Sequence, residues 1–465
     1  MSEFTGNWFA LIALLGCPLV AAVLYKVLPS SQATIWTILG GFLLLPSDVA
    51  IKFTMIPAFD KNSIPNICAC IGCMVCSPKR RKSSLAKLPV LIAAIYLLSP
   101  LVTSAFNNDL ISIGGGRVLP GVGYYDAISA IVYQSLFFLP FPLGWRFLGE
   151  SKEIEEVFRA LAVAGLVYSL PTLFEIRLSP QLSAWIYGVF NSSFITEARY
   201  GGFRPVVFMI NGLALSFFLM TTVLAVLALR RTKTPIGKVP LRGAAAYLAV
   251  VVVLTKSAGA LLYTIAGSLL TGIATPRNSI RIAVMLVTIA LAYPLLRTTG
   301  LFPTDTLVDM ASALNEQRGS SLKTRFDQED QLLARASERF TFGWGRYGRN
   351  RVHTEDYGGD VSLTDGLWVI TMGQFGLVGF LALFGLLSFP VFRAARALRY
   401  SPSEREKVFL SGLALIVALT VVEQIPNASI SPWSWLLSGV LLGRTEALRS
   451  SQRRIVSPKI RPAIA

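Results

Sequence analysis

The sequence predicts an all-α integral membrane protein with about 12 transmembrane helices, both termini in the cytoplasm and one large outer loop. Of its 465 residues, 53% are hydrophobic and only 15% are charged, and the mean hydropathy is +0.58. That balance is too apolar for a chain whose surface faces water. Apolar runs of roughly 15 to 25 residues recur along the whole length. They lack the alternation of barrel strands, so we expect helices, which satisfy their own backbone groups inside a bilayer.

These apolar runs define the candidate spans in order. The first resembles a secretory signal in position, but it lacks a basic leader and more apolar sequence follows at once, so we expect it to be retained. The pairs of runs near Thr255 and Asn427 are short enough to be half-helices instead of full spans. The spans are expected at Trp8–Leu28, Ala33–Met55, Pro89–Phe106, Ile128–Leu143, Ala160–Phe174, Val206–Leu229, Gly243–Thr255, Ala258–Ile273, Ile282–Leu296, Leu367–Phe389, Val408–Val422 and Trp433–Leu442.

The distribution of basic residues orients the chain, because Lys and Arg near span ends are retained on the cytoplasmic side. Most of the 43 basic residues fall in the loops expected inside, from Lys61 and Lys79–Lys82 to the basic tail at 444–465. The net charge of +17 therefore marks membrane topology, and no nucleic-acid partner is expected. We predict a single polytopic membrane domain, residues 1–465, containing a large outer loop at 298–364.

The remaining basic residues cluster in two outer loops, residues 175–205 and 298–364. Basic residues are disfavoured on that side, so the cluster calls for an anionic ligand. A guanidinium stays charged at any accessible pH and binds phosphate oxygens in a bidentate fork. The alternative is that individual arginines pair with acidic residues of the same loop or touch lipid headgroups. As a group, the arginines expected to bind a diphosphate are Arg199, Arg204, Arg346, Arg349 and Arg351.

Glycine and aromatic residues surround these arginines at 199–205 and 342–349. The glycines permit tight turns, and Trp344 and Tyr347 are candidates for stacking on a sugar face or for sitting at the membrane interface. The charged segment Leu314–Arg339 contains no proline, so it should form one or two amphipathic helices lying over the outer mouth as a lid.

Four features then point to one family. They are the stretch Arg199-Tyr-Gly-Gly-Phe-Arg204-Pro205, the helical start Thr255-Lys256-Ser257-Ala-Gly-Ala, the long loop before the tenth span, and the segment that closes it, in which Asp365-Gly366 is followed by nine residues and Gly376-Leu-Val-Gly379. Together they resemble the O-antigen ligase and O-antigen polymerase superfamily of bacterial multispanning membrane glycosyltransferases. In ligases of that family the closing segment begins with His, so the spacing fits while aspartate replaces the histidine.

The resemblance implies metal-independent transfer, without a cofactor, of an undecaprenyl-diphosphate-linked glycan onto an acceptor glycan or glycolipid. It also implies the bacterial inner membrane, an active site facing the periplasm, and polysaccharide-assembly proteins as further partners. A base is implied at Asp365, and a carboxylate can accept the acceptor's proton. Asp365 can equally cap the following helix. His353, the only histidine, is the other candidate base.

The missing histidine favours polymerisation of surface polysaccharide repeats, with ligation to a lipid core as the alternative. A transporter or flippase of a glycolipid or anionic solute is the rival from another class, although carriers usually show internal repeats and none is visible here. Four cysteines, Cys68, Cys70, Cys73 and Cys76, have spacing that can bind zinc or an iron–sulfur cluster. Their apolar surroundings favour a reduced cluster close to the membrane instead.

Overall fold

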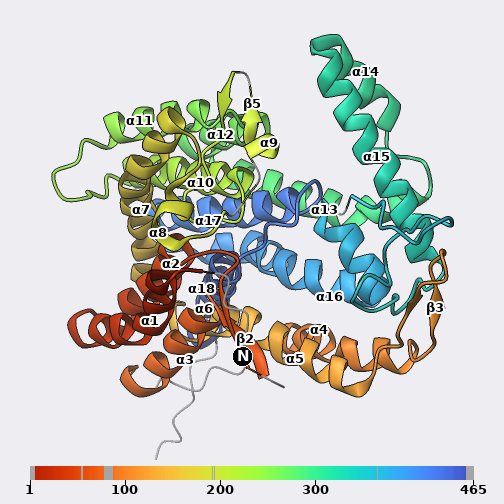
Figure 1. The fold of residues 1–465 in the computed structure, drawn as a ribbon. Helices are drawn as coiled ribbons and strands as arrows, with labels where there is room; N and C mark the ends of the chain where they lie inside the picture. The colour runs from red at the N-terminus through yellow and green to blue at the C-terminus, as the bar shows by residue number, and fades with distance from the viewer. Residues whose placement is uncertain are drawn as a thin grey trace, which may run out of the picture.

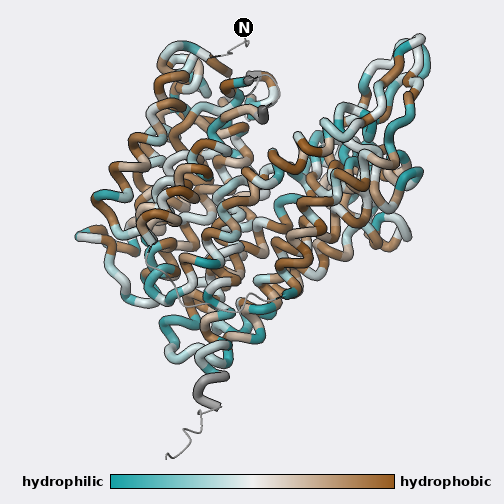
Figure 2. Tube along the Cα trace, turned by 90° about the horizontal axis from the view of Figure 1, so that it is seen from below, coloured by the Kyte–Doolittle hydropathy of each residue, from teal (hydrophilic) through white to brown (hydrophobic). Residues whose placement is uncertain are grey.

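The computed structural model is an α-helical bundle with three two-stranded hairpins (Figure 1). It describes residues 6–53, 56–77, 87–190, 192, 194–199, 201–363 and 365–456. Within these residues, 7 helical segments are long and apolar enough to cross a membrane, and further apolar helices are shorter. Hydrophobic residues run along the helices, and hydrophilic residues gather toward the ends of the bundle (Figure 2). The all-α prediction is confirmed, and the chain is a multi-pass membrane protein.

The first third of the chain differs from the expected order of spans. Helix α2 ends at Leu44 because Pro46 follows, and Ala50–Phe53 of the expected span Ala33–Met55 form the first strand of the hairpin β1–β2. Helix α3 then returns beside α2, where Gly41 lies against Pro65 closely enough to leave no room for a Cβ atom. The elements are α1 (Trp8–Val27), α2 (Ser30–Leu44), β1 (Ala50–Phe53), β2 (Ile56–Asp60) and α3 (Ser63–Cys76).

The remaining spans lie close to where the apolar runs place them. A proline at position 140 divides one expected span into α5 and α6. The elements are α4 (Lys87–Ala105), β3 (Ile111–Ser112), β4 (Val118–Leu119), α5 (Tyr124–Phe138), α6 (Pro140–Phe147), α7 (Ser151–Leu178), α8 (Leu182–Tyr187), α9 (Phe194–Glu197), β5 (Ala198–Arg199), β6 (Gly202–Phe203), α10 (Gly212–Arg231), α11 (Leu241–Leu254), α12 (Ala258–Gly272), α13 (Pro276–Thr298), α14 (Thr304–Leu314), α15 (Glu316–Ser337), α16 (Leu367–Ala397), the 3-10 turn η1 (Leu398–Tyr400), α17 (Glu404–Glu423) and α18 (Pro432–Val456).

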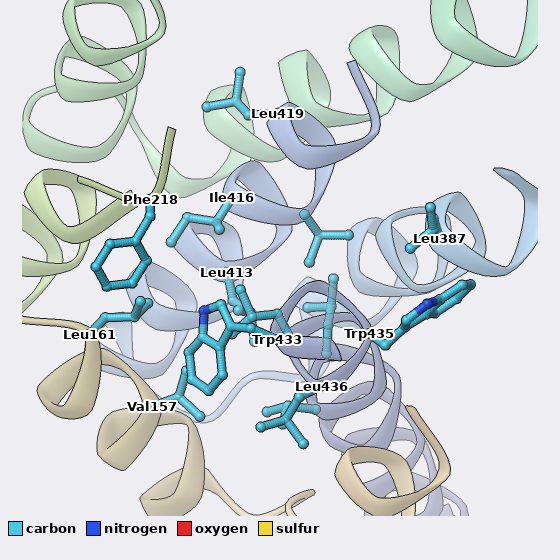
Figure 3. Packing of buried hydrophobic residues seen from close by; sticks show 14 of the residues in the cluster. Val157, Leu161, Phe218, Leu387, Leu413, Ile416, Leu419, Trp433, Trp435 and Leu436 are labelled. Carbon is cyan, nitrogen blue, oxygen red and sulfur yellow. The ribbon is translucent and has the colours of Figure 1, made fainter. Parts of the chain in front are cut away.

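The core forms around α10, α17 and α18, which are apolar on most of their circumference and are therefore surrounded by other helices. Figure 3 shows Phe218 of α10, Leu413 of α17 and Leu436 of α18 in this core. The fully buried Trp435 packs its ring against Phe138, with ring centroids 4.9 Å apart, and against other aromatic rings nearby.

Ion pairs gather the predicted inner loops at one end of the bundle, which we call the basic end. Arg405, in the first turn of α17, pairs with Glu155 at the start of α7 at 2.7 Å. Arg444 of α18 donates to Glu406 at 2.6 Å and to the carbonyl of Gly149 at 3.4 Å. These contacts place three of the predicted inner loops, those containing Glu155, Arg405 and Arg444, at one end of the bundle. The opposite end carries the described residues among 107–122, 179–211, 299–366 and 424–431, and we call it the loop end.

Among the described residues, the first and last helices do not follow the order expected for two termini on one side. The backbone N–H of Asn7 donates to the carbonyl of Tyr187, and the Tyr187 hydroxyl donates to the carbonyl of Leu44, so α1 begins at the loop end. Helix α18 ends at the basic end. The difference arises because α3 adds one traverse to the expected twelve. Lys61, assigned to an inner loop, also lies at the loop end, where its Nζ donates to the carbonyl of Phe208 at 2.7 Å.

Helices α14 and α15 project from the loop end beside each other (Figure 1). Their amphipathic character is as predicted, but they stand away from the bundle instead of lying flat over it. Most of the buried residues of α15 lie in its last turns, at Leu332, Leu333 and Ala336. We call α14 and α15 the loop helices.

Candidate active site

Helix α16 is broken at Gly376, the first glycine of the closing segment, which has φ 65° and ψ −166°. The break leaves backbone N–H and carbonyl groups on both sides of it without partners within the helix. Residues 340–345 form hydrogen bonds with these groups. A Cβ atom at position 376 would lie 2.3 Å from the carbonyl group of Thr341, so only glycine fits. Four hydrogen bonds of 2.8 to 3.2 Å join the two segments, from the N–H groups of Trp344, Gly345, Leu377 and Val378 to the carbonyls of Gly373, Gln374, Phe340 and Thr341 respectively.

Asp109, just after α4, anchors the same loop from the other side. Its carboxylate accepts from Arg339 at 2.6 Å and from Arg349 at 3.0 Å. The hydrogen bond from Arg339 holds the pKa of Asp109 below its usual value. Arg349 is only 1% exposed, and its guanidinium also donates to the carbonyls of Asp109, Pro120 and Trp344. Arg349 is therefore held by protein groups on all sides, which indicates an anchor for the loop.

Trp344 is 7% exposed, and its indole N–H donates to the carbonyl of Arg335 at 2.7 Å. The guanidinium carbons of Arg335 and Arg339 lie 3.5 and 4.1 Å from the centroid of its ring. These cation–π contacts occupy the aromatic surface that a sugar would need. The placement of Trp344 argues for a structural role and against the expected sugar stacking.

Tyr347, in contrast, is 56% exposed at a turn where its φ is 62°. The guanidinium of Arg346 lies 5.9 Å from the Tyr347 ring and 5.5 Å from the ring of Tyr133 on α5. No ion pair joins Arg346 to a carboxylate within the described part of the chain. Arg346 and Tyr347 thus present a cation and an aromatic face together.

Arg351 pairs with Asp360 of its own loop, as the alternative interpretation anticipated. His353 lies opposite Asp360 in a short antiparallel bridge that holds the same turn. These residues stabilise the loop locally.

The β5–β6 hairpin brings two of the family-like stretches together. Lys256, at the turn between α11 and α12, donates from Nζ to the carbonyl of Arg199 at 3.1 Å. The Nζ atom would lie 2.4 Å from a Cβ at Gly202, so the ammonium rests directly on the hairpin. Arg199 is exposed and its guanidinium donates to the carbonyl of Ala198. Arg204 is buried and pairs with the buried Glu197 at 3.6 Å.

Asp365 lies one residue before the N-cap of α16, which is Gly366, and therefore does not cap this helix as one interpretation expected. Its side chain is 50% exposed, and its Oδ2 lies 3.5 Å from Nη2 of Arg325 on α15. A carboxylate at the histidine position of the family pattern is thus paired with a cation from a loop helix.

A second carboxylate beside this pair was not predicted. Glu423, at the end of α17, is buried, accepts from Asn427 Nδ2 at 2.7 Å and is hydrogen-bonded to Tyr263 of α12. The charge of Arg325 acts on it as well. The signal was present in the sequence, because a glutamate at the end of an apolar span usually faces protein or water.

Glu329 fixes α15 on the bundle. Its carboxylate accepts from the Tyr293 hydroxyl of α13 at 3.1 Å and from Trp368 Nε1 of α16 at 3.3 Å. Arg297 of α13 lies 3.6 Å from Glu329 and pairs with Asp330 at 2.6 Å. Burial raises the pKa of Glu329. This network sets the position of Arg325 one turn earlier on the same helix.

The expected diphosphate set falls into two groups. Arg199 and Arg204 lie with the β5–β6 hairpin, which Lys256 contacts, whereas Arg346, Arg349 and Arg351 lie in the loop that packs against α16 and Asp109. In the part of the chain that the structure describes, no group of three or more His, Cys, Asp or Glu residues is arranged to hold a metal ion. The five cysteines are free thiols.

Residues 243–384 match a protein-family model described as O-antigen ligase. The matched range begins in α11 and ends within α16, so it includes Lys256, Arg325, Asp365 and Gly376. A search of curated proteins gives no match.

Proposed function

We propose that this protein, which carries an O-antigen ligase family domain at residues 243–384 and is thus a membrane glycosyltransferase of the ligase and polymerase type, polymerises surface polysaccharide repeats. It would move an undecaprenyl-diphosphate-linked glycan onto an acceptor glycan. The observation that carries the proposal is the pairing of Asp365, at the position of the family's histidine, with Arg325 of α15.

In this proposal Asp365 takes the proton from the acceptor hydroxyl as its oxygen attacks the anomeric carbon of the donor. The bond from that carbon to the diphosphate oxygen breaks, and undecaprenyl diphosphate leaves with the electron pair. Asp365 is partly exposed, so an acceptor can reach it. Arg325 would hold the carboxylate in place and then face the negative charge that grows on the leaving group, where fixed cations lower a barrier most.

The diphosphate is proposed to bind on the side of α16 where Asp365 lies. Arg199 and Lys256, which lie in adjoining turns, would supply two positive charges to it, and Arg325 a third. Across α16, Arg346 and Tyr347 would contact the glycan, since an exposed aromatic ring suits a sugar face. Arg204, Arg349 and Arg351 would act indirectly, by fixing the two loops through Glu197, Asp109 and Asp360.

The orientation follows from the charge of the basic end. If its Lys and Arg residues are retained in the cytosol, the loop end with residues 298–364 faces the periplasm, where lipid-linked glycans would be polymerised. The tail at 444–465 would then be cytoplasmic, and the amino terminus periplasmic; residues 457–465 of this tail lie outside the described residues.

The direct test is to incubate the purified protein in liposomes with undecaprenyl-diphosphate-linked oligosaccharide and separate the products by size. A ladder of products, formed equally well with a metal chelator present, is the expected result. A single transfer to added lipid core would mean a ligase and would overturn the polymerase assignment. Movement of unmodified lipid across the bilayer without any product would mean a carrier and would overturn the enzymatic proposal for this site.

A further inference from the structure

A second basic site lies at the basic end, on the opposite side of the molecule from Asp365. The ends of three helices enclose a pocket of about 600 Å³ there. Arg231 comes from the end of α10, Arg277 and Arg281 from the start of α13, and Lys407 from the start of α17. The only acidic residue in the lining is Glu404. The glycosyl transfer proposed above uses none of these residues.

The charges in this pocket are not balanced by the protein. Glu404 pairs with Lys407 at 2.6 Å, and Arg231 is fixed by donating to the carbonyls of Thr271 and Ala274 at 3.0 and 2.6 Å. Arg277 and Arg281 are exposed, and no ion pair joins either to a carboxylate among the described residues. They stand four residues apart on α13, so two like charges lie on one helical face, which is unfavourable without a counter-ion.

The backbone at the start of α13 adds to the positive charge of the pocket. Helix α13 is 23 residues long and begins at Pro276, with the Thr275 side chain accepting from the N–H of Asn278. The first turn of such a helix carries a partial positive charge. Thr275, Pro276 and Asn278 all line the pocket, so the helix start and the arginines face one space.

We propose that this pocket binds a phosphate group, which a guanidinium pair and a helix start recognise together. The apolar surroundings favour the headgroup of an anionic phospholipid as its source. Ile273, directly before the pocket, is 76% exposed, and Leu269 of α12 and Met285 of α13 are exposed on the adjoining helical surfaces. Acyl chains could lie against these residues while the phosphate enters the pocket.

Native mass spectrometry of the purified full-length protein tests this with phosphatidylglycerol, uncharged phosphatidylcholine and inorganic phosphate as probes. We expect the wild type to retain phosphatidylglycerol in preference to phosphatidylcholine. The double variant Arg277→Gln/Arg281→Gln should bind phosphatidylglycerol about tenfold more weakly or worse, because two surface charges are lost. Arg277→Lys/Arg281→Lys, which keeps both charges, should retain most of the binding and so excludes misfolding as the cause.

Lys238→Gln/Arg242→Gln is the matched control, since it removes two basic residues at the same end and the same spacing but outside the pocket. It should leave phosphatidylglycerol binding unchanged. If inorganic phosphate raises the unfolding temperature of the wild type but not of Arg277→Gln/Arg281→Gln, and phosphatidylglycerol shows no preference, the pocket takes a soluble phosphate instead. If neither probe distinguishes the pocket variant from the control, the phosphate site does not exist.

Discussion

Arginine side chains at the loop end are of two kinds. Arg204 and Arg349 are buried against carboxylates, whereas Arg199 and Arg346 pair with no carboxylate in the chain as described. Removing one member of a buried ion pair leaves the other charge buried without a partner, which lowers stability. Removing an exposed guanidinium mainly removes its interaction with a ligand. Loss of activity is therefore informative about binding only for the second kind.

Arg199→Ala should lower the rate of glycan transfer by about 10²- to 10³-fold, as for the loss of one fixed donor at a developing charge, without lowering the unfolding temperature. Product formation in liposomes and thermal unfolding in detergent measure the two effects. Arg177→Ala, an exposed arginine at the same end with no place in the proposed site, should behave as the wild type. Equal activity of both variants would remove Arg199 from the diphosphate site.

Asp365→Asn should lower the rate by about 10²- to 10⁴-fold, because an amide cannot accept the acceptor's proton. Asp365→Glu should recover part of that loss. Asp309→Asn, at an exposed position on α14, serves as the control, and His353→Gln should also keep its activity. An Asn variant at 365 that transfers glycan at the normal rate would show that the base lies elsewhere.

The role proposed for Asp365 rests on a local pattern in the sequence, its distance from two glycines. The sequence could not show that Arg349 is buried, since its partner Asp109 lies 240 residues away in the chain. Trp344 presents a similar case: the indole is covered by Arg335 and Arg339 only after the loop has folded onto α4 and α16. Side-chain burial in a long loop depends on such distant contacts, which residue spacing does not encode.

At the scale of elements, α16 and the loop before it form one unit, because the break in the helix is closed by hydrogen bonds from residues 340–345. The apolar run predicted this span, but the positive φ at Gly376 depends on the hydrogen bonds that the loop makes with the broken helix. Helix α3 was missed for a different reason. Its 14 residues are too few for an ordinary span, and its cysteines favoured a different interpretation.

Gly376→Ala should destabilise the protein by about 1–3 kcal/mol or more, because the new methyl group collides with Thr341 and the backbone is in a left-handed conformation. Gly385→Ala on the same helix is the control. A Cβ there meets only Ile92, at 3.9 Å, and alanine favours a helix, so it should be neutral or stabilising. Chemical or thermal unfolding of both proteins measures the difference; similar curves would mean that the break in α16 is not required.

Glu329→Ala should loosen α15 from the bundle, because Tyr293, Trp368 and Arg297 lose their shared partner. Hydrogen–deuterium exchange should then increase across α15 and remain unchanged in α10. Asp327→Ala, two residues away and exposed, should leave exchange as it is in the wild type. If α15 exchanges equally in both variants, the helix is held by its apolar contacts alone.

At the scale of the whole molecule, the two ends of the bundle differ in chemistry. Inter-loop ion pairs close the basic end, and the loop end carries Asp365 with the exposed arginines. Charge counting assigned the loops around Glu155, Arg405 and Arg444 to one side, and ion pairs and hydrogen bonds join these loops. It misplaced Lys61 and the start of α1 because parity is lost when a single helix is not recognised.

Because α1 begins at the loop end and α18 ends at the basic end, the proposed orientation gives a direct prediction for labelling of intact cells. In a variant without the native cysteines, a cysteine introduced at Lys323 should react with a membrane-impermeant maleimide, and one at Lys238 should react only after lysis. An epitope added at the amino terminus should be accessible from outside, and one at the carboxyl terminus should not. Protection of position 323 would reverse the proposed orientation, and an amino-terminal epitope protected like position 238 would contradict the packing of α1.

The closure of α16 by residues 340–345 also bears on how antibodies can be raised. A synthetic peptide copying residues 339–351 has neither the open helix nor Asp109 to bind, so it has no reason to hold its native turn in water. Sera against that peptide should recognise denatured protein on a blot and fail to label whole cells. Immunogens copying α14 and α15 together are the better choice for detecting the folded protein, because these two helices pack mainly against each other.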